Sequence, residues 1–185
     1  MTQSPLTEAN RRTILKSLSA ISAAGMTGLA GCAGGGNGNG DDNGNGAGTI
    51  SADEYPAVDE WMTETEIGDA ARLYDGEIVD LREESDVAID VGAGDEGLAF
   101  EPSAVAVSSG TEVLWEWTGE GGAHNVEAEP DEQIGESDYE FSSGEAEDGD
   151  DIEYTHTFDE EGIALYHCEP HIANGMKGSV VVEEE

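Results

Sequence analysis

Short runs in which apolar and polar residues alternate dominate the second half of the chain. These runs lie at 87–91, 105–107, 113–117, 152–158, 163–167 and 180–183, and turn signals lie between them at 108–110, 119–122, 160–162 and 174–175. Successive side chains of a strand point to opposite faces, so the runs predict half-buried strands. Frequent turns between short strands favour an antiparallel β-sandwich or barrel, and roughly 100 residues of this pattern can close one core. The sequence therefore predicts an all-β domain.

The charge of the chain limits its partners and its solvent. Its 185 residues include 43 Asp and Glu against 6 Lys and Arg, a formal net charge of −37. This charge repels phosphate backbones and argues against nucleic-acid binding. It also opposes compaction in dilute buffer, whereas concentrated salt shortens the Debye length to about 3 Å and screens the repulsion. A halophilic protein is therefore favoured over an acidic disordered one, because the second half is rich in Trp, Tyr and Val.

The first thirty residues have the organisation of an export signal. Arg11, Arg12 and Lys16 are half of the basic residues, and an apolar stretch of small residues follows at 14–30. This order of charged and apolar regions is typical of a signal peptide, and the paired arginines resemble a twin-arginine (Tat) signal. We therefore predict a twin-arginine-type lipoprotein signal peptide at residues 1–31.

The apolar stretch ends in Leu29-Ala30-Gly31-Cys32, which resembles a lipobox. The cysteine of such a motif is lipidated and becomes the mature N-terminus, which would anchor the exported protein to the outer face of the cytoplasmic membrane. An ordinary cleaved signal with a spare cysteine, or an uncleaved anchor, are the alternatives. Lipidation of Cys32 would leave Cys168 as the one remaining thiol, so that no intramolecular disulfide could form.

A flexible tether is expected after Cys32. Residues 33–48 are mainly Gly and Asn, with two Asp and two Ala and without apolar periodicity, which predicts a reach of about 20–24 Å. A phosphate-binding loop does not fit, because no strand precedes the segment and no Lys-Ser/Thr ends it. We therefore divide the chain into the signal peptide (1–31), a lipid-anchored linker (32–54) and one β domain (55–185), whose first twenty residues form a short helical or irregular lead-in.

The densest chemical signal is the spacing Cys168-x2-His171-x4-Met176, which lies between a predicted strand and the last strand. His124 follows the glycine turn at 119–122 and begins a predicted strand at 124–128. One thiolate, two imidazoles and a weak axial thioether are the donor set of a blue-copper electron-transfer site. Since three ligands share one loop and His124 comes from a distant strand end, the metal would lie where two loops meet at one end of the sandwich.

Four further residues have expected roles. Pro170 lacks an N–H and stiffens the ligand loop. Asn125 is not expected to bind the metal itself but is placed to connect the two ligand loops. His156 falls on the apolar phase of its strand and is interpreted as a core or surface histidine. His167 alternates away from Cys168 and is not expected to be a ligand, although it could form a weak surface metal site.

These residues resemble the cupredoxins, and most closely the plastocyanin-like halocyanins of salt-loving archaea. The resemblance runs from 100 to 182, more loosely back to 55, and is carried by Phe100-Glu101-Pro102, Val113-Leu114-Trp115-Glu116-Trp117, Gly121-Gly122-Ala123-His124-Asn125-Val126 and the ligand loop at 168–178. It implies a Greek-key sandwich with a type-1 copper at His124, Cys168, His171 and Met176, in a plastocyanin-like domain that shuttles single electrons. The family usually has an aromatic residue just before the cysteine, which is thought to offer a remote electron path. His167 stands there in this chain, so the exposed edge of His171 is the favoured route.

We therefore expect a membrane-tethered monomer that carries electrons between a redox donor and a redox acceptor in the membrane, and that is not an enzyme. It would dock through a small apolar patch around His171. A copper storage protein or chaperone without redox shuttling is the alternative. A copper oxidase or nitrite reductase would need a further histidine cluster, and two of the four histidines are already used. A zinc-binding module stays open, because Zn²⁺ accepts the same ligands. A nucleophile–base pair of Cys168 and His171 would leave Met176 unexplained.

Overall fold

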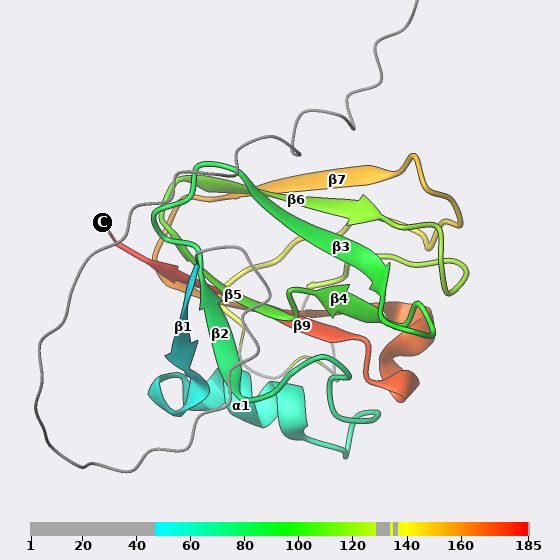
Figure 1. Cartoon of the computed structure of the whole chain (residues 1–185), viewed down its shortest axis with the longest axis horizontal. Helices are drawn as coiled ribbons and strands as arrows, with labels where there is room; N and C mark the ends of the chain where they lie inside the picture. The colour runs from blue at the N-terminus through cyan, green and yellow to red at the C-terminus, as the bar shows by residue number, and fades with distance from the viewer. Residues whose placement is uncertain (1–46, 129–133, 135–136, 185) are drawn as a thin grey trace, which may run out of the picture. The chain divides into compact units, whose positions relative to one another are not determined.

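The computed structural model describes residues 47–128, 134 and 137–184, which form two β-sheets packed face to face (Figure 1). The strand order is β1-β2-β5-β9-β8 in one sheet and β4-β3-β6-β7 in the other. The elements are β1 (Gly48–Ser51), η2 (Ala52–Glu54), α1 (Pro56–Thr63), β2 (Glu77–Asp80), β3 (Val87–Ala93), β4 (Ala99–Glu101), β5 (Ala104–Ser108), β6 (Thr111–Trp117), β7 (Glu153–Phe158), β8 (Gly162–His167), η3 (Glu169–Asn174) and β9 (Lys177–Glu183). The predicted signal peptide and Cys32 lie outside the described residues.

The six alternating runs coincide with β3, β5, β6, β7, β8 and β9, which confirms the predicted all-β sandwich. In β6 the residues Val113, Trp115 and Trp117 are buried while the residues between them are not. Trp115 is central to the core between the sheets, because its ring lies 5.5–6.3 Å from the rings of four other aromatic residues, Phe141, Tyr154, Phe158 and Tyr166. The alternation thus records which side chains fill the space between the two sheets.

The prediction of antiparallel pairing is wrong for three strand pairs. Strands β2 and β5, β3 and β6, and β5 and β9 run parallel. The chain changes sheets after β2, β4, β5 and β7, so neighbours within a sheet are often joined by a crossover instead of a hairpin, and crossovers permit parallel pairing. Alternation shows which residues face the core but carries no information about the direction of the neighbouring strand.

Residues 124–128 do not form the predicted strand. His124 bridges Glu147, whereas Glu127 bridges both Ser142 and His167. The segment therefore changes its backbone partner within three residues, between the 142–147 loop and the end of β8, and no regular ladder can form. This irregular course places His124 and Asn125 at one end of the sandwich.

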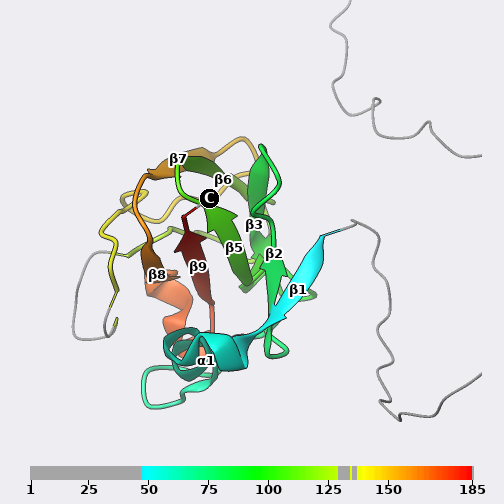
Figure 2. The ribbon, with the colours of Figure 1, turned by 90° about the vertical axis from the view of Figure 1, so that its left-hand side faces the viewer.

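The lead-in contains a helix, as expected. Pro56 occupies the first turn of α1, where its missing N–H costs no hydrogen bond. Val58, Trp61 and Met62 of α1 are buried against Ala104, Ala106, Leu165 and Val181, which face away from the other sheet. The helix thus covers the outer face of the five-stranded sheet (Figure 2). Strands β5 and β9 are buried on both faces as a result.

Residues 48–54, at the end of the predicted linker, also have regular structure. Strand β1 pairs antiparallel with β2 along its whole length, and the backbone N–H of Ala52 donates to the carbonyl of Gly76 at 3.0 Å. Ala52 itself is buried in the same apolar cluster as α1. In the structure, therefore, these seven residues pack with the β domain.

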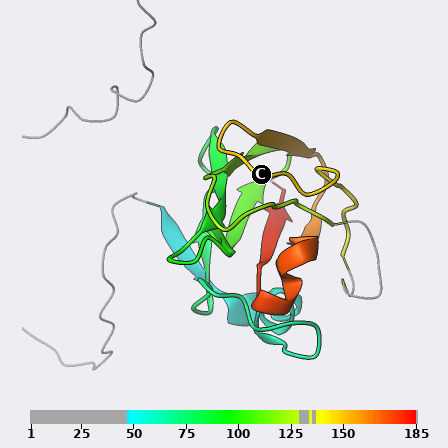
Figure 3. The ribbon, with the colours of Figure 1, turned by 90° about the vertical axis from the view of Figure 1, so that its right-hand side faces the viewer.

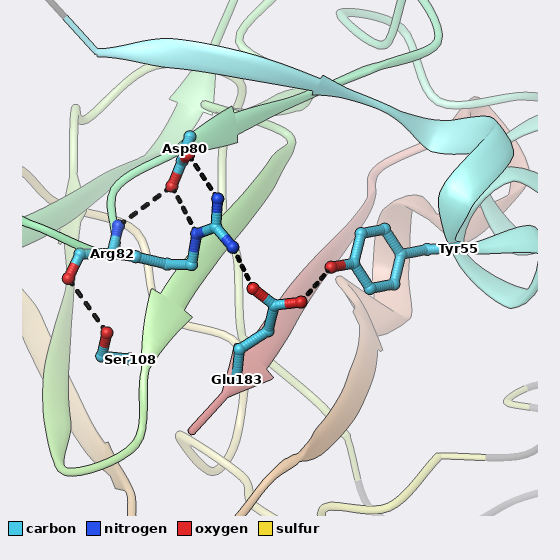
Figure 4. Close-up of polar contacts among 5 residues, drawn as sticks. All are labelled: Tyr55, Asp80, Arg82, Ser108 and Glu183. Atoms are coloured by element: carbon cyan, nitrogen blue, oxygen red, sulfur yellow. Dashed lines mark hydrogen bonds and ion pairs between the residues drawn. The ribbon is translucent and has the colours of Figure 1, made fainter. Parts of the chain in front are cut away.

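A polar cluster joins the lead-in to the last strand (Figure 4). Arg82 donates to both carboxylate oxygens of Asp80 and pairs with Glu183, which also accepts a hydrogen bond from Tyr55. Hydrogen bonds from Arg82 lower the pKa of Asp80, and hydrogen bonds from Tyr55 and Arg82 lower the pKa of Glu183. Burial and the contact with Glu183 raise the pKa of Tyr55 to about 12.

Replacement of Arg82 by Gln should lower the free energy of unfolding by about 0.5–1 kcal/mol at pH 7, because these partly exposed ion pairs are screened by water. Asp80 and Glu183 have depressed pKa values in the folded state, so their contribution is present above an unfolded pKa of about 4. It is lost as the pH falls through the lower folded pKa values. Urea unfolding of the unmodified protein and of Arg82→Gln at constant salt should therefore show a difference in the free energy of unfolding that shrinks below pH 4. An equal difference at pH 3 and pH 7 would contradict this assignment.

Candidate metal centre

Three of the predicted ligands meet at one end of the sandwich. The Sγ atom of Cys168 lies 3.6 Å from Nδ1 of His124 and 3.5 Å from Nδ1 of His171, and the two Nδ1 atoms are 3.1 Å apart. A point in the plane of these three atoms and equidistant from them lies about 2 Å from each, which is close to the roughly 2.0–2.1 Å of metal–nitrogen bonds and a little short of the roughly 2.3 Å of a metal–sulfur bond. One metal ion therefore fits between the three side chains without any of them moving far.

The ring of His124 is held by the turn that precedes it. Its Nε2 lies 2.8 Å from the carbonyl oxygen of Glu120, which can only accept a hydrogen bond. Nε2 must therefore carry the proton in the neutral ring, which leaves the lone pair of Nδ1 facing Cys168. The indole Nε1 of Trp117 donates to the carbonyl of His124 at 3.2 Å and fixes its backbone. Burial lowers the pKa of His124, so the ring favours the neutral form that binds metals.

The thiol of Cys168 is fully buried. Burial raises its pKa to about 11, while hydrogen bonds from the backbone amides of Asn125 and His171 pull the pKa in the opposite direction. The same amides would stabilise a thiolate once a metal had displaced the proton. His171 is half-buried, and its pKa is lowered by burial and by the neighbouring His124.

Backbone hydrogen bonds shape the loop that carries Cys168, His171 and Met176. The loop turns through η3, with Pro170 exposed in its first turn, and ends at Gly175, which has a left-handed φ of 78°. Cys168 donates its N–H to the carbonyl of Met176 at 3.0 Å, and Met176 donates to His171 at 3.2 Å. Met176 is fully buried in the same core cluster as Cys168. The loop thus returns Met176 to the side of the other predicted ligands.

Asn125 connects the two ligand loops. Its Nδ2 donates to the carboxylate of Glu169 at 2.7 Å and to the carbonyl of Gly144 at 3.1 Å, and its Oδ1 accepts from the N–H of Glu169 at 2.9 Å. Asn125 is completely buried. One side chain therefore fixes the distance between the residue after His124 and the residue after Cys168, as its sequence position suggested.

The other two histidines lie apart from the metal-binding group. His156 is half-buried with its ring stacked on Phe141 at 4.6 Å, which agrees with a core or surface histidine. The suggestion that His167 could form a surface metal site is wrong, because His167 is fully buried and its ring lies 6.3 Å from that of Trp61. Helix α1 covers this position, and the sequence around His167 gives no indication that a helix from another part of the chain packs on it.

Copper binding should become tighter with rising pH. Between pH 7 and pH 9 the thiol of the metal-free protein is protonated, since its pKa is about 11, whereas both histidines are neutral. Each copper ion must then displace about one proton, so the affinity should rise about tenfold per pH unit. Competition titration of Cu(I) against a chelator, corrected for the chelator's own protonation, measures this slope. An affinity independent of pH would show that Cys168 is not a ligand.

The sandwich and its cluster of two imidazoles and one thiol define a copper-binding β protein. Residues 87–183 match the model of the copper binding proteins of the plastocyanin/azurin family, and the chain belongs to that family. The chain is 47% identical to a halocyanin of Natronomonas pharaonis over 126 residues, which are 68% of this chain and 71% of that protein.

Two solved structures extend the comparison. A purple cupredoxin from Nitrosopumilus maritimus is 26% identical with a TM-score of 0.41, over 52% of this chain and 99% of that one. A Cu-containing nitrite reductase from Thermus scotoductus SA-01 is 21% identical with a TM-score of 0.42, and the match covers 54% of this chain but 22% of the reductase.

Copper fits the residues that are present. Thiolate and thioether donors suit Cu(I), and imidazole suits copper in either oxidation state. The cluster of His124, Cys168 and His171 offers two imidazoles and one thiol whose donor atoms lie within 4.8 Å of one another. The thioether of Met176 follows on the same loop. Copper bound there would supply one-electron chemistry. The protein contributes a set of donors that its own hydrogen bonds already hold in place.

Proposed function

We propose that the chain is a type-1 (blue) copper protein that carries single electrons between redox partners at a membrane. The observation that supports this most strongly is that protein hydrogen bonds, independent of any metal, fix each side of the cluster. Glu120 orients His124, and Asn125 ties the loop of His124 to the loop of Cys168. Donors that are held in this way need little rearrangement when the charge of the site changes by one electron, which favours rapid electron exchange.

In this proposal Cys168 supplies the strong thiolate bond, His124 and His171 complete a trigonal plane, and Met176 is the weak axial ligand. Copper storage is the competing function. A carrier should exchange electrons with a small redox dye much faster than it transfers copper to a chelator, and stopped-flow absorption measures both rates on one sample. Copper transfer faster than electron exchange would favour the storage function instead.

Replacement of Met176 by Gln should retain a copper site but lower its reduction potential, because an amide oxygen stabilises Cu(I) less than a thioether does. Protein-film voltammetry measures the potential directly. Leu114→Gln places the same amide on the partly exposed face of β6, away from the ligand loop, and should leave the potential unchanged. If Met176→Gln also left the potential unchanged, Met176 would not be the axial ligand.

Membrane attachment is proposed to depend on Cys32. No helix among the described residues is long and apolar enough to cross a membrane. A lipid on Cys32 would hold the carrier near its partners, and the linker would raise its effective concentration there if it spans the distance. Cys32→Ser should move the protein from the membrane fraction to the soluble fraction of cells. Unchanged membrane association would contradict the lipid anchor.

Docking is proposed to occur around the exposed part of His171. Because salt screens long-range steering, contact there must depend on short-range packing. Leu73 is a large hydrophobic side chain with 42% of its surface exposed, and its neighbour Arg72 donates to the carbonyl of Asn174 in the ligand loop. Leu73→Ser should slow electron transfer to the physiological partner while leaving exchange with a small dye unchanged. Equal rates with the partner would argue against this surface.

A further inference from the structure

The segment at 61–72 packs against the residues on both sides of Met176. It runs from the end of α1 into the loop before β2, and it lies outside residues 87–183, which the family model matches. Figure 3 shows this loop beside η3, and Figure 1 shows the same arrangement from another side. The contacts reach 172–175 before Met176 and 177–178 after it.

Two glycines allow the two backbones to touch. A Cβ atom on Gly68 would overlap the carbonyl oxygen of Ile172, and a Cβ on Gly175 would overlap the carbonyl oxygen of Ala70. Both glycines have positive φ values, 74° and 78°, which other residues seldom adopt. No side chain fits between the loop before β2 and the ligand loop at these points, so a shift of one loop must displace the other.

Hydrogen bonds reinforce the contact on each side of Met176. Arg72 donates from Nε to the carbonyl of Asn174 at 2.8 Å, and its guanidinium also pairs with Glu96 in the β3–β4 turn. After Met176, the buried ammonium of Lys177 donates to the carbonyl of Glu64 at 3.0 Å. The indole of Trp61 donates to the carbonyl of Gly178 at 3.2 Å, and the Lys177 ammonium lies 4.9 Å from the centre of that ring.

We propose that residues 61–72 form a clamp that positions Met176 relative to Cys168 and His171 and thereby helps to set the reduction potential. The axial ligand is weak, so its distance from the metal depends on the protein more than on the bond itself. The backbone of Met176 is already bonded to Cys168 and His171, and the clamp fixes its two neighbours. This inference rests on the proposed function, because Met176 sets a potential only if copper is bound. Gly68 and Arg72 are positioning residues in this account.

A pair of glycine substitutions tests the clamp. Gly68→Ala introduces a methyl group into the carbonyl of Ile172, whereas Gly76→Ala, in the same loop and with a φ of 90°, meets nothing within 4 Å. Both variants carry the strain of alanine at positive φ. Gly68→Ala alone should shift the reduction potential and the visible spectrum of the full chain loaded with copper. In the metal-free chain it should speed amide exchange at Gly175 and Met176 at least tenfold. Equal potentials and exchange rates in the two variants would overturn the clamp.

A charge-matched pair covers the case in which Gly68→Ala does not fold. Arg72→Gln removes the donor to Asn174, and Arg82→Gln removes an equal charge from the cluster with Asp80 and Glu183. Arg72→Gln should shift the reduction potential and speed amide exchange at Gly175 and Met176. Arg72→Lys should show smaller changes in both quantities, and Arg82→Gln should change neither. Identical behaviour of Arg72→Gln and Arg82→Gln would overturn the clamp.

The exchange rates separate this inference from the proposed function. They are measured without metal, so they report only on the mechanical contact between the two loops. Faster exchange in Gly68→Ala together with an unmodified chain that shows no blue band would support the contact and refute the copper carrier. A normal blue band with unaltered exchange and potential in Gly68→Ala and Arg72→Gln would refute the clamp and leave the carrier standing.

Discussion

Replacement of Cys168 by Ser should abolish the blue absorption band and weaken copper binding by at least about 100-fold, the upper end of the cost of substitutions that only support a ligand. Cys168 contributes the one thiol of the cluster, with its Sγ 3.5–3.6 Å from Nδ1 of both imidazoles. A serine hydroxyl at that place remains protonated near neutral pH and is a poor donor to Cu(I). Spectroscopic titration with Cu(II) and competition titration with Cu(I) measure the two effects.

Cys32→Ser is the matched control, because it makes the same chemical change at the other cysteine of the chain. It should leave both the band and the affinity unchanged. If Cys168→Ser kept an intense blue band, or if both serine variants lost it, Cys168 would not be the copper thiolate.

Replacement of Asn125 by Ala should lower the free energy of unfolding by about 2–3 kcal/mol and the copper affinity by about 10–100-fold. The buried amide makes three hydrogen bonds, two of them to Glu169 next to Cys168, and alanine makes none of them. The carbonyl of Gly144 and the N–H of Glu169 would lose their partner. The distance between the loops of His124 and Cys168 would then no longer be fixed. Denaturant unfolding and copper competition measure the two quantities.

Asn125→Asp separates hydrogen bonding from side-chain size. The carboxylate has nearly the same shape but cannot donate, and it would face the carboxylate of Glu169, which now accepts from Nδ2 at 2.7 Å. It should therefore be at least as destabilising as alanine at pH 7. If aspartate were tolerated as well as asparagine, the bridge between the loops would not be what Asn125 contributes.

The sequence predicted the positions of the strands and their core-facing residues better than it predicted how the strands pair within each sheet. Trp115 and its neighbours in β6 alternate because one face of that strand packs on the core. In β9 the residues from Lys177 to Val182 are all buried, since one face meets the other sheet and the opposite face meets α1. Alternation cannot report a second covered face, and it cannot report that β5 and β9 run parallel.

The spacing Cys168-x2-His171 led to two of the three side chains that cluster with His124, and it also led to Met176, which stays a predicted axial ligand on the same loop. The partners of those donors were less accessible to sequence reasoning. The carbonyl of Glu120 orients His124, and any residue has a carbonyl. The roles of Gly68 and Gly175 could not be predicted either, since their close backbone contact depends on two loops that lie about a hundred residues apart in the sequence. Asn125 was the exception, because its short polar side chain directly follows a ligand.

The most direct test of the central claim is the visible absorption spectrum of the folded protein in high salt after loading with Cu(II). The proposed site predicts an intense blue thiolate-to-copper band that disappears on reduction and returns on reoxidation. A colourless protein that holds zinc, or that binds copper only as Cu(I), would contradict the electron-carrier function.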